Sequence, residues 1–115
     1  MSKFNLELET LKNLNYRKVI STTKNMQLVL MSLKPLEDIP EEIHPKTSQF
    51  FRIEQGTIKI IIDGSSKILK DGQSLIVPAG SKHYVKCIGK QPAKLYTIYA
   101  PPEHPDGLTQ KIKPK

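Results

Sequence analysis

Apolar and polar residues alternate along most of this chain, in short runs separated by turn residues. A period of two is typical of strands with one buried face. Asp63-Gly64 is a strong hairpin signal, because glycine accepts the positive φ of a tight two-residue turn. About nine or ten short strands with frequent turns predict an all-β sandwich or barrel. The clearest of these runs are Gln27–Leu33, Gln49–Glu54, Thr57–Ile62 and Leu95–Tyr99.

The N-terminal segment follows a helical period instead, which predicts a short amphipathic helix. Its apolar residues recur three or four positions apart: Phe4, Leu8, Leu11 and Leu14. We therefore expect a helical segment over residues 1–15 and a β-barrel over 16–100. A C-terminal loop and a frayed basic tail are expected over 101–115.

The composition is that of one globular domain, with 115 residues of which 37% are hydrophobic and 25% are charged. Cys87 is the only cysteine, which excludes an intrachain disulfide and multi-cysteine zinc sites. We expect it to point inward as a small hydrophobe. No apolar run approaches the ~20 residues that span a bilayer, and no signal-peptide pattern opens the chain. These features predict a cytoplasmic protein without a membrane partner.

A net charge of +7 raises the question of nucleic-acid binding. Of the 18 basic residues, however, only Arg17 and Arg52 are arginines, and the lysines are scattered without interleaved aromatic residues. Arginine is the residue that reads phosphate and guanine through paired hydrogen bonds. The pattern favours a solvated, lysine-rich surface, and we predict no nucleic-acid partner.

Strand parity places a polar side chain in the predicted interior. Gln49, Phe51 and Ile53 share one face of their strand, and the apolar pair belongs inside. Gln49 therefore points into the barrel, where its amide needs polar partners. A metal ion is one such partner, and backbone groups of the barrel are the alternative.

Three further polar residues are predicted to share a strand face with one another or with apolar residues. Glu42 and His44 are two apart and share a face if that segment is extended. His83 shares a face with Val85 and Cys87. The alternative is that His44 is a surface histidine and Glu42 a solvated carboxylate.

Two spaced motifs contain these polar residues. The first is Glu42-x-His44-x4-Gln49-x6-Gly56, and the second is Gly72-x5-Pro78-x-Gly80-x2-His83. With these motifs, about residues 34–100 resemble a small single-domain cupin of the RmlC-like superfamily. The resemblance implies a jelly-roll β-barrel.

The resemblance also implies a bound divalent transition metal, with Fe, Mn, Ni or Zn all compatible with the ligands. By position, the ligands would be Glu42, His44, Gln49 and His83. Glu42 stands where the family usually has histidine, and Gln49 stands where it has glutamate. This exchange keeps a single negative charge and indicates a retuned site, in which Glu42 is also the candidate catalytic base. In the family, the first motif begins with a glycine that is separated by five residues from the first ligand position. Leu36 stands at the position of that glycine in this chain.

The function predicted from this resemblance is a metal-dependent isomerase, lyase or dioxygenase acting on a small polar metabolite such as a sugar or sugar acid. Mannose-6-phosphate isomerase-like chemistry belongs to this range. The alternative is a non-catalytic barrel that binds a small molecule. A homodimer is also implied, for which the edge strand Tyr16–Ile20 is a candidate surface.

Aromatic residues elsewhere are expected to be structural. Phe51, Tyr96 and Tyr99 are predicted to be core or interface residues rather than a sugar-stacking platform. His104 is expected at the surface of the C-terminal loop, and the alternative is that this loop folds over the barrel mouth.

Overall fold

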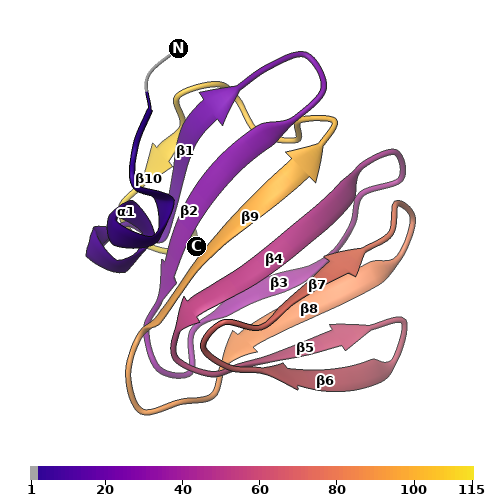
Figure 1. Cartoon of the computed structure of the whole chain (residues 1–115). Coiled ribbons are helices and arrows are strands. Elements are labelled where there is room, and N and C mark those ends of the chain that lie inside the picture. The colour runs from indigo at the N-terminus through magenta and orange to yellow at the C-terminus, as the bar shows by residue number, and fades with distance from the viewer. Residues whose placement is uncertain (1–2) are drawn as a thin grey trace.

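The computed structural model describes residues 3–115 as two facing antiparallel sheets with one short helix (Figure 1). The six-stranded sheet has the order β10 (Thr109–Gln110), β1 (Arg17–Thr22), β2 (Gln27–Leu33), β9 (Ala93–Ala100), β4 (Ser48–Gln55), β7 (Ser74–Val77). The four-stranded sheet has the order β3 (Asp38–Ile43), β8 (Lys82–Cys87), β5 (Ile58–Ile62), β6 (Ser65–Leu69). This all-β jelly roll with a short N-terminal helix confirms the predicted fold class.

The core lies between the two sheets and follows the predicted alternation. On β4, Phe51 and Ile53 are fully buried, whereas Phe50 and Arg52 point to the outer face and stay half-buried. On β8, every second residue likewise points inward, and Cys87 is one of these and is fully buried as expected. Aliphatic burial at about 25 cal/mol per Å2 is the main stabilising contribution of this interior.

Turn chemistry explains the predicted hairpin. Asp63 and Gly64 both have positive φ, at 47° and 83°, and they join β5 to β6 through the pair Ile62 and Ser65. Those angles match the type of two-residue turn that suits the twist of paired strands. The sequence signal and the observed hairpin therefore agree.

The strand β3 was not predicted, because Pro40 interrupts the apolar alternation that marks a strand. Proline lacks an N–H donor and is tolerated at sheet edges. β3 is an edge strand of the smaller sheet, and its register on β8 shifts between Ile39 and Glu42. This irregularity accommodates Pro40 and sets the direction of the residues that follow.

The helix α1 (Leu6–Lys12) confirms the predicted element, but its predicted apolar face is not buried. Leu8 and Leu14 are 48% and 84% exposed, and the buried helix residue is Thr10. Asn5 caps the helix by accepting a hydrogen bond from the Leu8 backbone N–H. Among residues 3–115, no helix has the length and apolarity that a membrane crossing needs.

The C-terminal segment corrects the expectation of a frayed tail. Gln110 and Thr109 form β10, which pairs with Arg17 and Lys18 of β1. The backbone carbonyl of Leu108 also accepts a hydrogen bond from the Val19 N–H. The edge of Tyr16–Ile20, predicted as a dimer surface, is thus already covered by the chain's own tail.

Candidate metal centre

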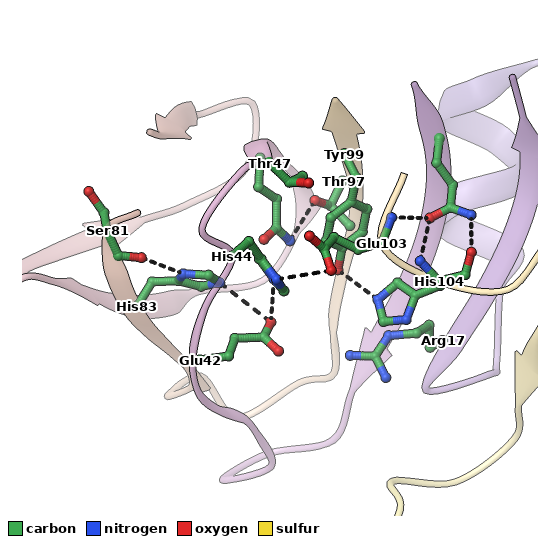
Figure 2. Close-up of polar contacts among 12 residues, drawn as sticks. Arg17, Glu42, His44, Thr47, Ser81, His83, Thr97, Tyr99, Glu103 and His104 are labelled. Carbon is green, nitrogen blue, oxygen red and sulfur yellow. Dashed lines mark hydrogen bonds and ion pairs between the residues drawn. The ribbon is translucent and has the colours of Figure 1, made fainter. Parts of the chain in front are cut away.

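Three of the predicted site residues meet between β3 and β8. Glu42 lies opposite His83 in the register of these two strands, and His44 follows one residue after the end of β3. The register shift before Glu42 turns this carboxylate and His44 toward the interior. Figure 2 shows the side chains of all three converging from the two strands.

The converging atoms are one carboxylate oxygen and two ring nitrogens. Glu42 Oε1 lies 3.2 Å from His44 Nε2 and 3.4 Å from His83 Nε2. The candidate ligand atoms of these three residues lie within 4.8 Å of one another. His83 is 1% exposed and His44 is 9% exposed, so the nitrogens face the interior rather than solvent.

The far side of each imidazole has its own oxygen partner. His83 Nδ1 lies 3.4 Å from the Ser81 carbonyl oxygen, and His44 Nδ1 lies 3.5 Å from Glu103 Oε2 (Figure 2). Glu42 Oε1 is the oxygen neighbour of both Nε2 atoms in the absence of a cation. With a cation between the three side chains, the oxygens at Nδ1 would hold the proton there and leave each Nε2 lone pair for the metal. This is the arrangement of a histidine that ligates a metal through Nε2.

Gln49 is the fourth predicted residue, and it is buried at 1% exposure on the inward face of β4. Its Nε2 donates to Thr97 Oγ1 at 2.9 Å, which orients the amide. The opposite end, Oε1, has no hydrogen-bond partner. The structure therefore leaves the oxygen of the amide, the atom that can bind a cation, without a partner.

Unpartnered polar atoms are concentrated at this place. Among residues 3–115, six buried side-chain nitrogen or oxygen atoms make no hydrogen bond, and four of them are Glu42 Oε1, His44 Nε2, Gln49 Oε1 and His83 Nε2. Native interiors rarely leave such atoms without a partner, because each costs about 1–3 kcal/mol. Two imidazoles, one carboxylate and one amide oxygen fit a divalent transition metal. The Glu/His/His group can therefore hold an ion.

Electrostatics favour the ionised carboxylate at the centre. Burial raises the pKa of Glu42, but the contacts with His44 and His83 lower it by more, so the net pKa is well below the usual range. The Glu42 contact in turn raises the pKa of His44. Glu42 is thus a weak base in this geometry and a good anionic ligand.

The comparison with known families agrees with this geometry. Residues 29–99, more than half of the chain, match the model of the cupin domain. This chain belongs to the cupin family.

Relatives of this cupin extend over nearly its whole length. It is 46% identical to uncharacterized protein L612 of Acanthamoeba polyphaga mimivirus, with 96% of this chain and 72% of that protein covered. It is 43% identical to uncharacterized protein YrkC of Bacillus subtilis, with 95% of this chain covered but only 62% of YrkC. The crystal structure of BH2720 from Bacillus halodurans superposes with a TM-score of 0.94 at 36% identity, covering 96% of this chain and 88% of BH2720.

The C-terminal loop folds over the polar end of the barrel. His104 is therefore placed as in the alternative prediction, not at the free surface of a loop. His104 Nε2 lies 3.1 Å from the Tyr99 hydroxyl (Figure 2). The fully buried Gln27 fixes this loop, because its Oε1 accepts hydrogen bonds from the backbone N–H groups of Glu103 and His104. The loop in turn brings Glu103 to His44. Tyr99 is 1% exposed, as expected for a core aromatic.

Burial also shifts the titration of the residues under this loop. It lowers the pKa of His104 to about 4, and the nearby Arg17 charge acts in the same direction. Burial raises the pKa of the Tyr99 hydroxyl. Both side chains are therefore neutral near neutral pH, and the Tyr99–His104 contact joins two uncharged groups.

Arg17 is the residue of this region that sequence reasoning missed. It was treated as one of the scattered surface cations, yet its side chain is buried at 8% exposure. Strand parity could have predicted its burial, because Arg17 shares a strand face with the buried Val19. Glu103 carried no comparable signal, since only the folded loop brings it to His44.

Proposed function

We propose that this cupin binds one divalent transition metal through Glu42, His44, Gln49 and His83. The observation that supports this proposal is the set of four buried polar atoms without hydrogen-bond partners. A metal in this position satisfies all four at once and removes the penalty of leaving them unpaired. The identity of the metal, among Fe, Mn, Ni and Zn, is left to experiment.

The reaction class follows from the fold and the donor set. We propose a metal-dependent enzyme of isomerase, lyase or dioxygenase type that acts on a small polar metabolite such as a sugar or sugar acid. A bound metal polarises a carbonyl or carboxylate oxygen of such a substrate as a Lewis acid. The protein itself fixes His44 through Glu103 and His83 through the Ser81 carbonyl.

A second candidate function is a non-catalytic barrel that binds a small molecule. The low pKa of Glu42 favours it, because a strongly acidic carboxyl makes a poor general base near neutral pH. The predicted catalytic role of Glu42 remains a prediction. If the protein is an enzyme with Glu42 as its base, Glu42→Gln should still bind the small-molecule substrate but no longer convert it. In a non-catalytic barrel, Glu42→Gln should change only the affinity for the small molecule.

Metal uptake is tested by titrating the metal-free protein with Co2+ and following its visible absorption. We expect one equivalent to bind the parent and His83→Ala to bind at least tenfold more weakly. His104→Ala is the matched control, since His104 is the remaining histidine and lies outside the proposed ligand set. Equal binding by parent and His83→Ala contradicts the ligand assignment.

The homodimer also remains a prediction. Because β10 covers β1, a dimer has to use a different surface from the edge Tyr16–Ile20. Gel filtration that gives a monomer at high protein concentration contradicts a dimer of any geometry.

A further inference from the structure

Arg17 is a cation of β1 that is buried at 8% exposure. Its Nη1 donates to Gln110 Oε1 at 2.6 Å, and the guanidinium carbon lies 5.3 Å from the centre of the Tyr16 ring. The Nε atoms of Arg17 and Arg52 are both buried without a hydrogen-bond partner, so the two arginines differ in the burial of the whole side chain and in ion pairing rather than at this atom. Among residues 3–115, no ion pair joins Arg17 to Asp or Glu.

The chain's other arginine provides the contrast. Arg52 lies on the outer face of β4, its side chain is 35% exposed, and it pairs with Glu54 at 3.0 Å. An arginine of that kind contributes to the surface and has its counter-charge within the chain. Arg17 is less exposed and lacks such a partner, although burying an unbalanced charge is unfavourable. An anion from outside the chain would correct this imbalance.

A pocket connects Arg17 with the candidate metal centre. It has a volume of about 310 Å3 and opens between β1, the second strand of the larger sheet, and β3, an edge strand of the smaller sheet. Arg17 and Glu42 both line it, and Figure 2 shows the two side chains on the same side of the site. The remaining lining residues are Tyr16, Ile39, Pro40, Glu41, Lys113, Pro114 and Lys115. A small molecule in this pocket therefore has Arg17 and Glu42, one residue of the candidate metal centre, among the residues around it.

The charges around this pocket suit a carboxylate better than a phosphate. Two lysines also line the pocket: Lys113 is already paired with Asp38, and Lys115 is exposed to solvent. Glu41 and Glu42 also line the pocket and repel a dianion. One guanidinium, with one N–H used by Gln110, matches the single charge and the planar shape of a carboxylate.

We propose that Arg17 is the anion-binding residue of this cupin and that its ligand is a small carboxylate with a second oxygen function. The carboxylate binds Arg17, and the second oxygen faces the Glu42, His44 and His83 centre. This inference rests on the proposed function and narrows its substrate class to small hydroxy- or oxo-acids. Arg17 is then a binding and positioning residue rather than part of the β1–β10 pairing alone.

Calorimetry with lactate, acetate and inorganic phosphate tests the proposal on the Zn2+-loaded and the metal-free protein. We expect lactate to bind the loaded parent and Arg17→Gln to bind it about tenfold to a hundredfold more weakly. Arg52→Gln is the matched control and should bind lactate as the parent does. Arg17→Lys keeps the charge but not the fork geometry, so its affinity should lie between those of the parent and Arg17→Gln.

The anion results separate this inference from the metal proposal. Acetate should bind the metal-free protein in an Arg17-dependent manner, which needs no metal. If the protein binds no metal but keeps Arg17-dependent acetate binding, the metal centre is wrong and this inference stands. If Zn2+ binds normally and Arg17→Gln binds lactate like the parent, the metal centre stands and this inference is overturned. Tighter Arg17-dependent binding of phosphate than of lactate overturns the carboxylate assignment.

Thermal melting distinguishes binding from a purely structural role of Arg17. Because Arg17 has no carboxylate partner, Arg17→Gln should melt within a few degrees of the parent, and lactate should raise the melting temperature of the parent only. A large loss of stability in both Arg17→Gln and Arg17→Lys, with no ligand-induced shift in the parent, overturns the proposal.

Discussion

The two ends of the barrel interior are built on the same strands but from opposite kinds of residue. On β4, the inward positions change from Gln49 at one end to Ile53 at the other. On β8, they change from His83 to Cys87. One end is a packed aliphatic core, and the other collects buried polar atoms without partners.

This difference separates the source of stability from the site of function. Each fully buried aliphatic side chain stabilises the fold by about 1.5–3 kcal/mol. Each buried polar atom without a partner destabilises it by about 1–3 kcal/mol. A ligand that binds at the polar end would therefore offset this cost, whereas the apolar end is stable without one.

The closing turns repeat the contrast. The turn at Leu36 closes the apolar end, where the Leu36 backbone N–H donates to the Cys87 carbonyl oxygen. At the polar end, the loop with Glu103 and His104 is held by the side chain of Gln27. A backbone hydrogen bond thus closes one end, and a buried side chain closes the other.

The largest expected effect is at the apolar end. Leu95→Ala removes a fully buried side chain and should lower the free energy of unfolding by about 2–5 kcal/mol. Metal stoichiometry, measured on the folded fraction, should stay at the parent value. Urea unfolding of the metal-free protein gives the free energy. A change below 1 kcal/mol would show that this end is not the main source of stability.

The loop over the polar end should depend on pH. The folded pKa of His104 is about 4, below the value of about 6.5 expected in the unfolded chain. The neutral, buried His104 therefore contributes its full share to the free energy of unfolding above pH 6.5, and this share is lost as the pH falls toward 4. Between these values, the parent should lose about 2 kcal/mol more than His104→Gln. Parallel unfolding curves at several pH values measure this difference, and identical losses in both proteins contradict it.

Gln49 should matter for the metal more than for the fold. Gln49→Met with Thr97→Val removes the buried amide together with its hydroxyl partner at nearly constant volume. We expect the metal-free melting temperature to stay the same or rise, and the metal affinity to fall at least tenfold. Thr97→Val alone is the control that should retain most of the affinity. A clear loss of stability with unchanged metal binding reverses this assignment.

The smallest effect is expected at the turn that closes the apolar end. Leu36 has a φ of 70°, a conformation that is strained for side chains other than glycine, and it is 72% exposed. Leu36→Gly should raise the free energy of unfolding by about 0.5–1 kcal/mol. Leu36→Ala removes the exposed side chain but keeps the strain, so it should give no gain. Destabilisation by Leu36→Gly contradicts the strain argument.

Local patterns predicted the parts of this protein that depend on local rules. Alternation placed Gln49 inward, and the resemblance to the two cupin motifs predicted Glu42, His44 and His83, which the fold brings together. The left-handed φ of Leu36 also explains why the first motif usually opens with glycine. These features are set by strand parity and turn geometry, which a sequence carries directly.

The features that the sequence did not predict depend on contacts between distant segments. Nothing local shows that Gln110 pairs with Arg17, or that Gln27 holds a loop more than 70 residues away. The helix was predicted as amphipathic, yet Leu8 of its apolar face remains exposed and Thr10 is buried. Periodicity identifies a helix, but the partner surface decides which of its faces is buried.

Elemental analysis of the purified, untagged protein beside its His44→Ala/His83→Ala variant tests the central claim most directly. We predict about one transition-metal ion per chain in the parent and none in the variant, with both proteins folded by circular dichroism. The identity of the metal then narrows the chemistry. A parent that remains metal-free after incubation with Fe2+, Mn2+, Ni2+ and Zn2+, or a variant that binds as much metal as the parent, contradicts the account.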